Sequence, residues 1–565
     1  MPSALTYPGV YVEEIPSGVR TITGVATSIT AFMGRAARGP LDADPESPVI
    51  INSYGDFERN FGALDPAYPM GYAVRDFYLN GGAQAAIVRL YQAVDGKPAK
   101  AAISLPDGTP EIVLEAASPG AWANGLRARV EAWVSDKDPR VSPEVANQFG
   151  LAASDLFNLT LHDTFSGVEE TFLNLTLKES PRRVDRILKS GSSLMRVAAS
   201  VDLSNLGDPA KIKVPRNGDL SDADKANGKT LWDADATAST GVDPGDSAGA
   251  GDARAADSAA LDDAVYLGDA NAKTGMYALK KTDLFNLLCI PPDTRGGDTS
   301  PAVYLQAMTY CVERRALLIV DAPNGWSSAG AITQQNNQAL TSLGLSGPAA
   351  RNAALYFPRV IESDPKRQGQ LDTFVPCGII AGVMARTDAQ RGVWKAPAGI
   401  DAALNGVAGL SVPLTDAENG MLNPLGVNCL RSFPQIGAVV WGARTLRGAD
   451  LLGDEYKYIP VRRLALYIEE SLYRGTQWVV FEPNDEPLWS QIRLNVGAFM
   501  HNLFRQGAFQ GATPNDAYFV KCDKETTTQN EINLGIVNIV VGFAPLKPAE
   551  FVVIQLQQMA GQIQT

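Results

Sequence analysis

The chain of 565 residues is long enough for several domains, and its 45% hydrophobic and 20% charged residues are typical of a folded soluble protein. Its net charge of −13 argues against nucleic acid or an anionic membrane as a partner, because both attract basic surfaces. No apolar stretch is long enough to span a membrane, and the N-terminus shows no pattern of a secretory signal peptide.

The chain begins with a short segment that has the pattern of a lone β-strand. Within TYPGVYVEEIPSG, Val10 and Val12 point to one face, and Tyr11 and Glu13 point to the other. Proline on both sides keeps this segment out of a helix. A strand of this length is not stable alone, so the question is what it pairs with.

The next part of the chain, residues 21–92, predicts alternating strands and helices. A strand ends at Gly34, and a short helix places Phe57 and Phe61 one turn apart. A longer helix then ends at a pair of glycines, and a buried strand follows at residues 86–90. This pattern indicates an α/β domain.

The middle of the chain has a different texture. Residues 93–200 contain short strands separated by turn residues, which predicts an inserted all-β domain, a small sandwich or barrel. Residues 219–263 hold eleven aspartates and three basic residues, a local net charge of −8, which predicts a solvent-exposed acidic insertion. The stretch DADKANG resembles a calcium loop, but Ala226 and Asn227 stand where a third ligand and the turn glycine are needed. A solvated acidic surface is the better interpretation.

The α/β texture returns from residue 276. DLFNLLCIPP and RALLIVDAP read as buried parallel strands with a crossover helix between them, and AALYFPRV and CGIIAGVMA are predicted as two further strands. Two amphipathic helices follow, one with Leu464 and Ile468 on its apolar face and one that runs from Pro487 to Gly507. The chain closes with predicted strands in AYFVKC, GIVNIVVGFAP and EFVVIQLQQ.

Residues that could support catalysis are few. The chain has two histidines, His162 and His501, and neither has a flanking metal-ligand pattern, so both are interpreted as surface or packing residues. The best enzyme motif is GWSSA, which approaches a G-x-S-x-G elbow and makes Ser327 a candidate hydrolase nucleophile. The serine follows its strand too late for that elbow, and Ser327 or Ser328 is better explained as a helix N-cap.

Other reactive residues have simpler interpretations. Glu482, Asp485 and Glu486 precede a helix and favour its N-terminus through the helix dipole. No phosphate-binding or dinucleotide-binding glycine loop occurs, so no cofactor is predicted. The cysteines are odd in number and have no metal-ligand spacing, which predicts reduced, mostly buried thiols in a protein made in a cytoplasm. They are Cys289, Cys311, Cys377, Cys429 and Cys522.

The sequence resembles the contractile phage tail sheath family. Near the N-terminus the resemblance lies in YPGVYVEEIPSG, TSITAFMGRAARGP, DFERNFG and FYLNGGAQAAIVR; later it lies in GIIAGVMARTDAQRGVWKAPAG, NPLGVNCLRSFPQIGAVVWGARTL, YKYIPVRRLALYIEESL, TQWVVFEPNDEPLW and PAEFVVIQLQQ. These motifs cover residues 1–90 and 280–565 in the family's order. One departure is Cys377-Gly378, where relatives often carry a Pro-Ser-Gly turn.

The resemblance implies a multidomain α/β fold whose sheath core is built from N- and C-terminal parts of the chain. The expected regions are a first arm, a first core part, an inserted β domain, an acidic outer insertion, a second core part, a tube-facing α/β domain and a last arm, at residues 1–20, 21–92, 93–200, 201–275, 276–430, 431–545 and 546–565.

The resemblance also implies how the subunit works. A sheath polymerises around an inner tube as a stacked helical homo-oligomer and contracts to drive the tube through a target cell envelope, without a cofactor and without enzymatic activity. An N-terminal and a C-terminal strand would each leave the subunit and join a small sheet on a neighbour. The strand residues expected in these contacts are Val10, Tyr11, Val12, Glu13, Phe551, Val552, Val553, Ile554 and Leu556.

The expected partners are the inner tail tube protein, the baseplate and the tail terminator, with neither nucleic acid nor direct membrane insertion. The particle would be a virion tail or injection device assembled in the bacterial cytoplasm. Candidate tube-facing residues on the second amphipathic helix are Arg493, Asn495, His501, Asn502 and Arg505. Two other hypotheses stay open: a hydrolase that uses Ser327, and a static shell protein that exchanges strands.

Overall fold

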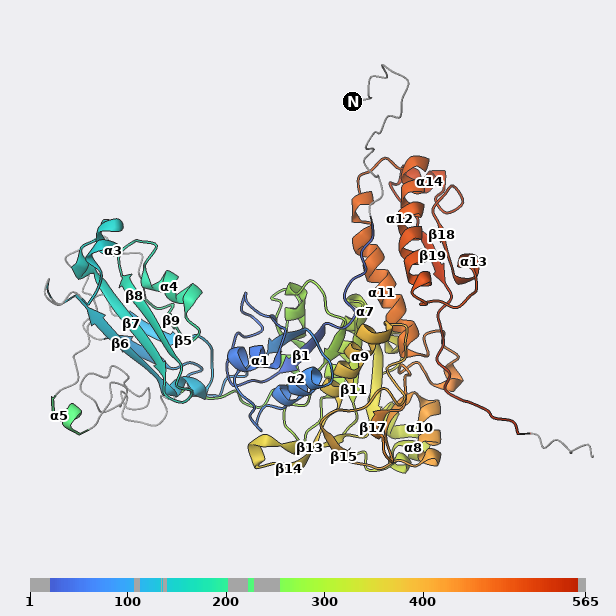
Figure 1. The fold of residues 1–565 in the computed structure, drawn as a ribbon, viewed down its shortest axis with the longest axis horizontal. Coiled ribbons are helices and arrows are strands. Elements are labelled where there is room, and N and C mark those ends of the chain that lie inside the picture. The colour runs from blue at the N-terminus through green and yellow to red at the C-terminus, as the bar shows by residue number, and fades with distance from the viewer. Residues whose placement is uncertain are drawn as a thin grey trace, which may run out of the picture.

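The computed structural model describes residues 21–105, 112–133, 135, 140–201, 222–227 and 255–556. Three regions are visible in Figure 1: a central α/β region, a β-rich region on the left that contains β4 to β9, and a C-terminal region of long helices at the upper right. The predicted first arm, residues 1–20, lies outside the described residues.

The central region is built on one eight-stranded sheet with the order β17-β16-β12-β11-β10-β1-β3-β2. The six inner strands are parallel, and β2 and β17 add to the two edges antiparallel. The strands are β1 (Thr30–Gly34), β2 (Val49–Ile51), β3 (Ala85–Arg89), β10 (Leu287–Cys289), β11 (Leu317–Asp321), β12 (Ala353–Phe357), β16 (Val427–Phe433) and β17 (Gly437–Val440). The predicted α/β fold class is confirmed.

Helices cover both faces of this sheet, which explains why its strands are continuously apolar. Within β1, Ala31 and Met33 face one core and Phe32 faces the other. On the Phe32 side lie α1 (Tyr54–Phe61), α2 (Pro69–Leu79) and α9 (Cys377–Arg391). On the other side lie α6 (Asp263–Leu267), α7 (Pro301–Glu313), α8 (Ala329–Thr341) and α10 (Asp416–Leu422).

The prediction of a strand in CGIIAGVMA was wrong, because this segment is the start of helix α9. The helix is buried from Cys377 to Ala385, so its sequence lacks the polar face that marks an amphipathic helix. It packs closely on α2: a Cβ added at Gly378 would lie 2.0 Å from the carbonyl oxygen of Ala73, and one at Gly382 would lie 2.5 Å from that of Phe77. The two glycines therefore allow the two helix backbones to touch.

The region predicted as an all-β insertion contains two three-stranded sheets, β4-β5-β9 and β6-β7-β8, around a core of its own. The strands are β4 (Ala102–Leu105), β5 (Ile112–Ala116), β6 (Leu126–Ala132), β7 (Leu156–Asp163), β8 (Glu169–Thr176) and β9 (Met195–Val197). It is not all-β, because it also holds α3 (Pro143–Gln148) and α4 (Val184–Gly191). Val184 and Leu188, one helical turn apart, are buried in its core.

Most of the predicted acidic insertion lies outside the described residues. Its one described inner piece, α5 (Asp222–Ala226), coincides with the calcium-like stretch, and no group of residues able to hold a metal ion occurs in the part of the chain that the structure describes. The end of the predicted range, residues 255–275, is anchored to the body by the buried residues Ala255 and Tyr266, while its aspartates at 257, 262, 263 and 269 are exposed.

A small sheet, β14-β13-β15, flanks the central region. Its strands are β13 (Val360–Asp364), β14 (Gln370–Phe374) and β15 (Val407–Leu410).

The C-terminal region consists of α11 (Ile459–Gly475), α12 (Glu486–Arg505), α13 (Pro514–Ala517), α14 (Gln529–Asn533) and a two-stranded sheet of β18 (Tyr518–Lys521) and β19 (Val540–Phe543). The predicted helix faces are confirmed, because Leu464 and Ile468 pack against Ile492 and Val496 in one core. Among the described residues, no helix has the length and apolar character needed to cross a membrane.

Candidate subunit interface

After β19 the chain leaves the C-terminal region, and the last described residues form an extended segment. Figure 1 shows this segment running away from the body at the lower right. We call residues 551–556 the C-terminal arm. Its apolar side chains are exposed by 76 to 94%: Phe551, Val552, Val553, Ile554 and Leu556. No strand within the described residues pairs with the arm. Burying each such side chain is worth roughly 1.5–3 kcal/mol, so the arm is a surface that gains from a partner.

The arm is fixed at its root by a buried ion pair. Arg444 is fully buried, and its Nε and Nη2 atoms donate to the two carboxylate oxygens of Glu550 at 2.8 and 2.5 Å. The Tyr458 hydroxyl donates to the same carboxylate at 3.2 Å, and Arg444 Nη1 also donates to Asp450 at 2.9 Å. The arm therefore starts from the central region, one residue after Glu550.

The electrostatics of this pair favour its charged form. Burial alone lowers the pKa of Arg444, but the hydrogen bonds and charge of Glu550, together with Asp450 and Tyr458, outweigh burial and raise that pKa above its usual value. A bidentate guanidinium–carboxylate contact also fixes the orientation of the Glu550 side chain relative to Arg444, since both groups are planar.

The two-stranded sheet β18–β19 is an incomplete sheet. Tyr518 pairs with Phe543 and Lys521 with Val540, and in the described part of the chain no third strand joins either edge. A two-stranded sheet is marginal on its own, and a free edge offers unpaired N–H and C=O groups to another strand. Phe519 and Val540 are also 49% and 43% exposed. The sheet can thus accept an added strand.

The described chain enters at the end of α11. The side chain of Ile22 lies 2.5 Å from the position that a Cβ on Gly475 would take, and the backbone N–H of Val25 donates to Ser471 Oγ at 3.2 Å. The Arg463 guanidinium donates to the carbonyl oxygen of Thr27 at 2.9 Å. These contacts fix the point at which residues 1–20, with the predicted strand residues Val10, Tyr11, Val12 and Glu13, join the C-terminal region.

The predicted tube-facing residues do not all reach the surface. His501, Asn502 and Arg505 are exposed on α12, and His501 Nδ1 lies 3.2 Å from the hydroxyl of Tyr518. Arg493 is half-buried and is bonded to Glu486 at 2.6 Å. Asn495 is 2% exposed and lies in the core stripe of α12, so it cannot contact a tube in this conformation.

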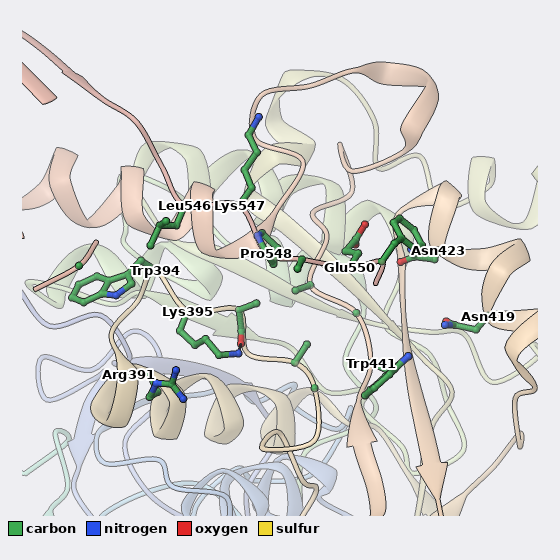
Figure 2. A pocket seen from close by; sticks show the side chains of 18 of the residues that line it. Arg391, Trp394, Lys395, Asn419, Asn423, Trp441, Leu546, Lys547, Pro548 and Glu550 are labelled. Carbon is green, nitrogen blue, oxygen red and sulfur yellow. Dashed lines mark hydrogen bonds between the residues drawn. The ribbon is translucent and has the colours of Figure 1, made fainter. Parts of the chain in front are cut away.

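A cavity of 830 Å³ lies beside residues 546–550, the strap that leads to the arm. Figure 2 shows the strap residues Lys547 and Glu550 on one side of the cavity and Arg391, Lys395 and Trp441 on the other, with the Lys547 side chain directed away from them. No serine, cysteine or histidine lines this cavity of the described structure, and its one carboxylate, Glu550, is engaged by Arg444. The described lining therefore does not supply the serine–histidine pair that the hydrolase hypothesis needs.

The remaining enzyme candidates are not brought together. Ser328 caps α8, because its Oγ accepts from the N–H of Ala331 at 3.1 Å, and the neighbouring Ser327 is exposed. Figure 1 places α8 and α12, the helix of His501, at opposite ends of the right-hand half of the molecule, and His162 lies in β7 of the inserted region. The serine–histidine hypothesis therefore has no geometric support.

The other reactive groups also have structural roles. Asp485 is the N-cap of α12, with its carboxylate accepting from the N–H of Glu486 at 2.7 Å, as the dipole interpretation predicted. All five cysteines are free and buried, as predicted.

Comparisons with known proteins agree on one family. Residues 267–446 match the family described as the phage tail sheath protein central domain, and residues 453–559 match the phage tail sheath C-terminal domain. A tail sheath protein of Vibrio phage KVP40 is 31% identical over 127 residues, which is 22% of this chain and 18% of that protein. A putative prophage major tail sheath protein of Pseudomonas aeruginosa is 24% identical over 296 residues, 50% of this chain and 68% of that protein.

Solved structures share the fold across nearly the whole chain. A sheath tail protein of Listeria innocua has a TM-score of 0.56 at 13% identity, covering 93% of this chain and 96% of its own. The contracted sheath complex of the extracellular contractile injection system PVC has a TM-score of 0.52 at 20% identity, covering 98% of both chains.

Proposed function

Because the chain belongs to the phage tail sheath family, we propose that it is a structural subunit of a contractile sheath, which polymerises around an inner tube and contracts to drive that tube through a target cell envelope. The observation that carries this proposal is the coexistence, in one subunit, of an exposed apolar arm without a strand partner and a two-stranded sheet with free edges. When two copies meet, the arm of one copy can pair with a free edge of the β18–β19 sheet of the other.

In the proposed assembly the C-terminal arm of one copy adds to the β18–β19 sheet of another, and the predicted N-terminal strand at residues 10–13 adds in the same way. This is β-augmentation, in which main-chain hydrogen bonds supply affinity and alternate side chains supply specificity. About five ladder hydrogen bonds at roughly 1 kcal/mol each would hold one strand, before the apolar burial is added. Such joints can keep copies connected while the bodies of the subunits move.

The partners follow from the same proposal. The exposed face of α12 that carries His501, Asn502 and Arg505 contacts the inner tube, and the ends of the sheath contact the baseplate and the tail terminator. The work of contraction comes from energy stored when the extended sheath assembles, so the subunit acts without a nucleotide, a cofactor or an enzymatic step. The particle is a tail or injection device assembled in the bacterial cytoplasm.

Negative-stain microscopy tests this function most directly. The chain, produced with its tube protein, should give hollow tubes that occur in a long and a short state, whereas a static shell would show one state. Two deletions, of residues 1–20 and of residues 551–565, should each leave a folded, soluble subunit that builds no sheath. Normal sheaths from either deleted chain would contradict strand exchange by that arm.

A further inference from the structure

One end of the C-terminal region carries large apolar side chains that are exposed in the described part of the chain. Val480 and Phe481, in the connection between α11 and α12, are 63% and 103% exposed, and Leu534 and Ile536, just after α14, are 68% and 42% exposed. The two segments lie side by side, because Asn484 Nδ2 donates to the carbonyl oxygen of Ile536 at 2.9 Å. We call these four residues the apolar tip.

The loop between α11 and α12 holds the Phe481 side chain outward. Its φ of +69° lies in the left-handed region, which disfavours any residue that has a Cβ and is rare for a bulky one. Hydrogen bonds on its C-terminal side fix this conformation: the N–H of Glu482 donates to the carbonyl oxygen of Val479 at 3.1 Å, and Trp489 Nε1 donates to Asn484 Oδ1 at 2.9 Å. Among the described residues, no contact of the fully exposed phenyl ring compensates for this strained backbone, so we explain it by a contact with another molecule.

The position of the tip indicates which contact that is. Ile22 packs on Gly475, at the end of α11, in the same core cluster as its neighbours Trp478 and Val479. The chain that precedes residue 21 therefore enters beside the tip. The predicted strand at residues 10–13 is separated from Ile22 by eight residues, which span at most about 28 Å when fully extended. A copy that receives this strand must lie within that distance of Ile22, which packs at the same end of α11 as the connection that carries Val480 and Phe481.

We propose that the apolar tip is a contact surface for a second copy of this chain, namely the copy that receives the N-terminal strand. This inference rests on the proposed function, because it needs the strand to be donated. The tip would bury Phe481 against the recipient and so fix the angle between the two subunits, while the strand alone provides only a flexible tether. The same end of the subunit then holds both the tether and the contact that orients it.

A photo-crosslinking residue in place of Phe481 tests the proposal in the full chain. We use p-benzoylphenylalanine at position 481, with the same residue at Phe165 as the control, since Phe165 is 71% exposed in the inserted region. After microscopy has verified assembly, irradiated sheaths should give a covalent dimer of this chain from position 481, and free subunits should give none. A conjugate with the tube protein, or no chain dimer from well-formed sheaths, would overturn the inference. Failure of the unaltered chain to form any sheath would instead overturn the proposed function, and the inference with it.

A second variant separates a contact role from a folding role. Phe481→Gly relieves the left-handed backbone, so the thermal midpoint of the free subunit should stay unchanged or rise. The loss of the buried ring should raise the subunit concentration needed for assembly about tenfold, and Phe165→Gly should leave that concentration unchanged. A lower thermal midpoint combined with normal assembly would show that Phe481 serves the fold of the subunit, and would overturn the proposal.

Discussion

The central sheet pairs one of its edges within the chain and ends the other in a short strand, whereas the β18–β19 sheet of the C-terminal region has no third strand at either edge in the described structure. On the outer side of β17, the N–H of Leu404 donates to the carbonyl oxygen of Ala438 and the N–H of Val440 donates to that of Ala402, both within 3.0 Å. The opposite edge strand, β2, is only three residues long. By contrast, β18 and β19 pair only with each other in the described structure, and the C-terminal arm pairs with nothing. In the proposed assembly, other copies of the chain complete the sheet of the C-terminal region.

The largest expected effect comes from a substitution in the C-terminal arm that leaves the central sheet unchanged. In an extended arm, Val552, Ile554 and Leu556 share one face, and Gln555 lies on the other. Ile554→Asp should abolish long sheaths, because it buries an unpaired carboxylate at several kcal/mol in every subunit contact. Gln555→Asp should be much milder, and both free subunits should melt normally because the arm is exposed. Sedimentation compares the two variants, and equal assembly would mean that the arm is not donated in this register.

The next effect tests the joint between the two regions. Arg444→Met leaves Glu550 without its buried partner and should lower the free energy of unfolding by about 3–5 kcal/mol. As a control, Arg59→Met removes an ion pair whose arginine side chain is 73% exposed, and it should change that free energy by no more than about 1 kcal/mol. Denaturant unfolding measures both variants. Similar values for the two would show that the arm root is not held by this pair.

A smaller effect concerns a carboxyl pair inside the central region. Asp76 and Glu362 are each 2% exposed, share a hydrogen bond, and have one guanidinium between them: Arg75 Nη2 lies 2.7 Å from Asp76 and 2.6 Å from Glu362. Burial, followed by the charge of Asp76, raises the pKa of Glu362, and burial also raises that of Asp76. Two tyrosines also lie near Arg75: Tyr54, on α1, and Tyr72, whose ring centroid is 5.2 Å from the guanidinium carbon.

The sign of the resulting pH dependence follows from linkage. A carboxyl group whose pKa is raised by folding stabilises the protein fully below its unfolded pKa of about 4.3, and this contribution is lost as the pH rises through the folded pKa. Stability of the natural protein should therefore fall above about pH 4.5, by up to about 1.4 kcal/mol per pH unit from this group. Glu362→Gln, which mimics the protonated acid, should flatten the thermal midpoint against pH; an unchanged slope would exclude Glu362 as its source.

The smallest expected effects lie at the discarded catalytic candidates. Ser327→Ala and His501→Ala sheaths should contract normally, because the proposed function assigns neither residue a role in a reaction. Ser328→Ala removes a helix cap and should cost about 1 kcal/mol of subunit stability without affecting contraction. Electron microscopy after a contraction trigger checks all three, and loss of contraction in assembled Ser327→Ala sheaths would revive an enzymatic step.

Features that depend on neighbouring residues in the sequence were predicted better than features that depend on residues far apart in the sequence. Buried strands such as β11 and the amphipathic helix α12 follow from local patterns, and both are present. Helix α9 does not, because a helix buried on all sides looks like a buried strand. The burial of Asn495 was also missed, since a polar residue on an apolar stripe is by default placed at the surface. For the candidate interface, the sequence predicted the apolar strand pattern of the C-terminal arm. It also predicted strands at β18 and β19, but not that these two strands pair with each other.

The contact between Arg444 and Glu550 had no signal that could have found it. The two residues are 106 positions apart, and the two family motifs in which they stand do not show that they pair. Phe481 is a similar case. Its exposure depends on a left-handed backbone conformation, which cannot be predicted where the residue is not a glycine or an asparagine. Long-range pairs and strained loops therefore mark the limit of what local patterns predict.

The buried pair at the arm root also decides where a mechanical load would go. If a neighbouring copy pulls on residues 551–556, the tension reaches Glu550 before it reaches the strap or β19. Two short parallel hydrogen bonds then pass it to Arg444, which is tied through Asn428 to β16 and the eight-stranded sheet. A pull on the arm would then load the eight-stranded sheet before it loads the hydrogen bonds between β18 and β19.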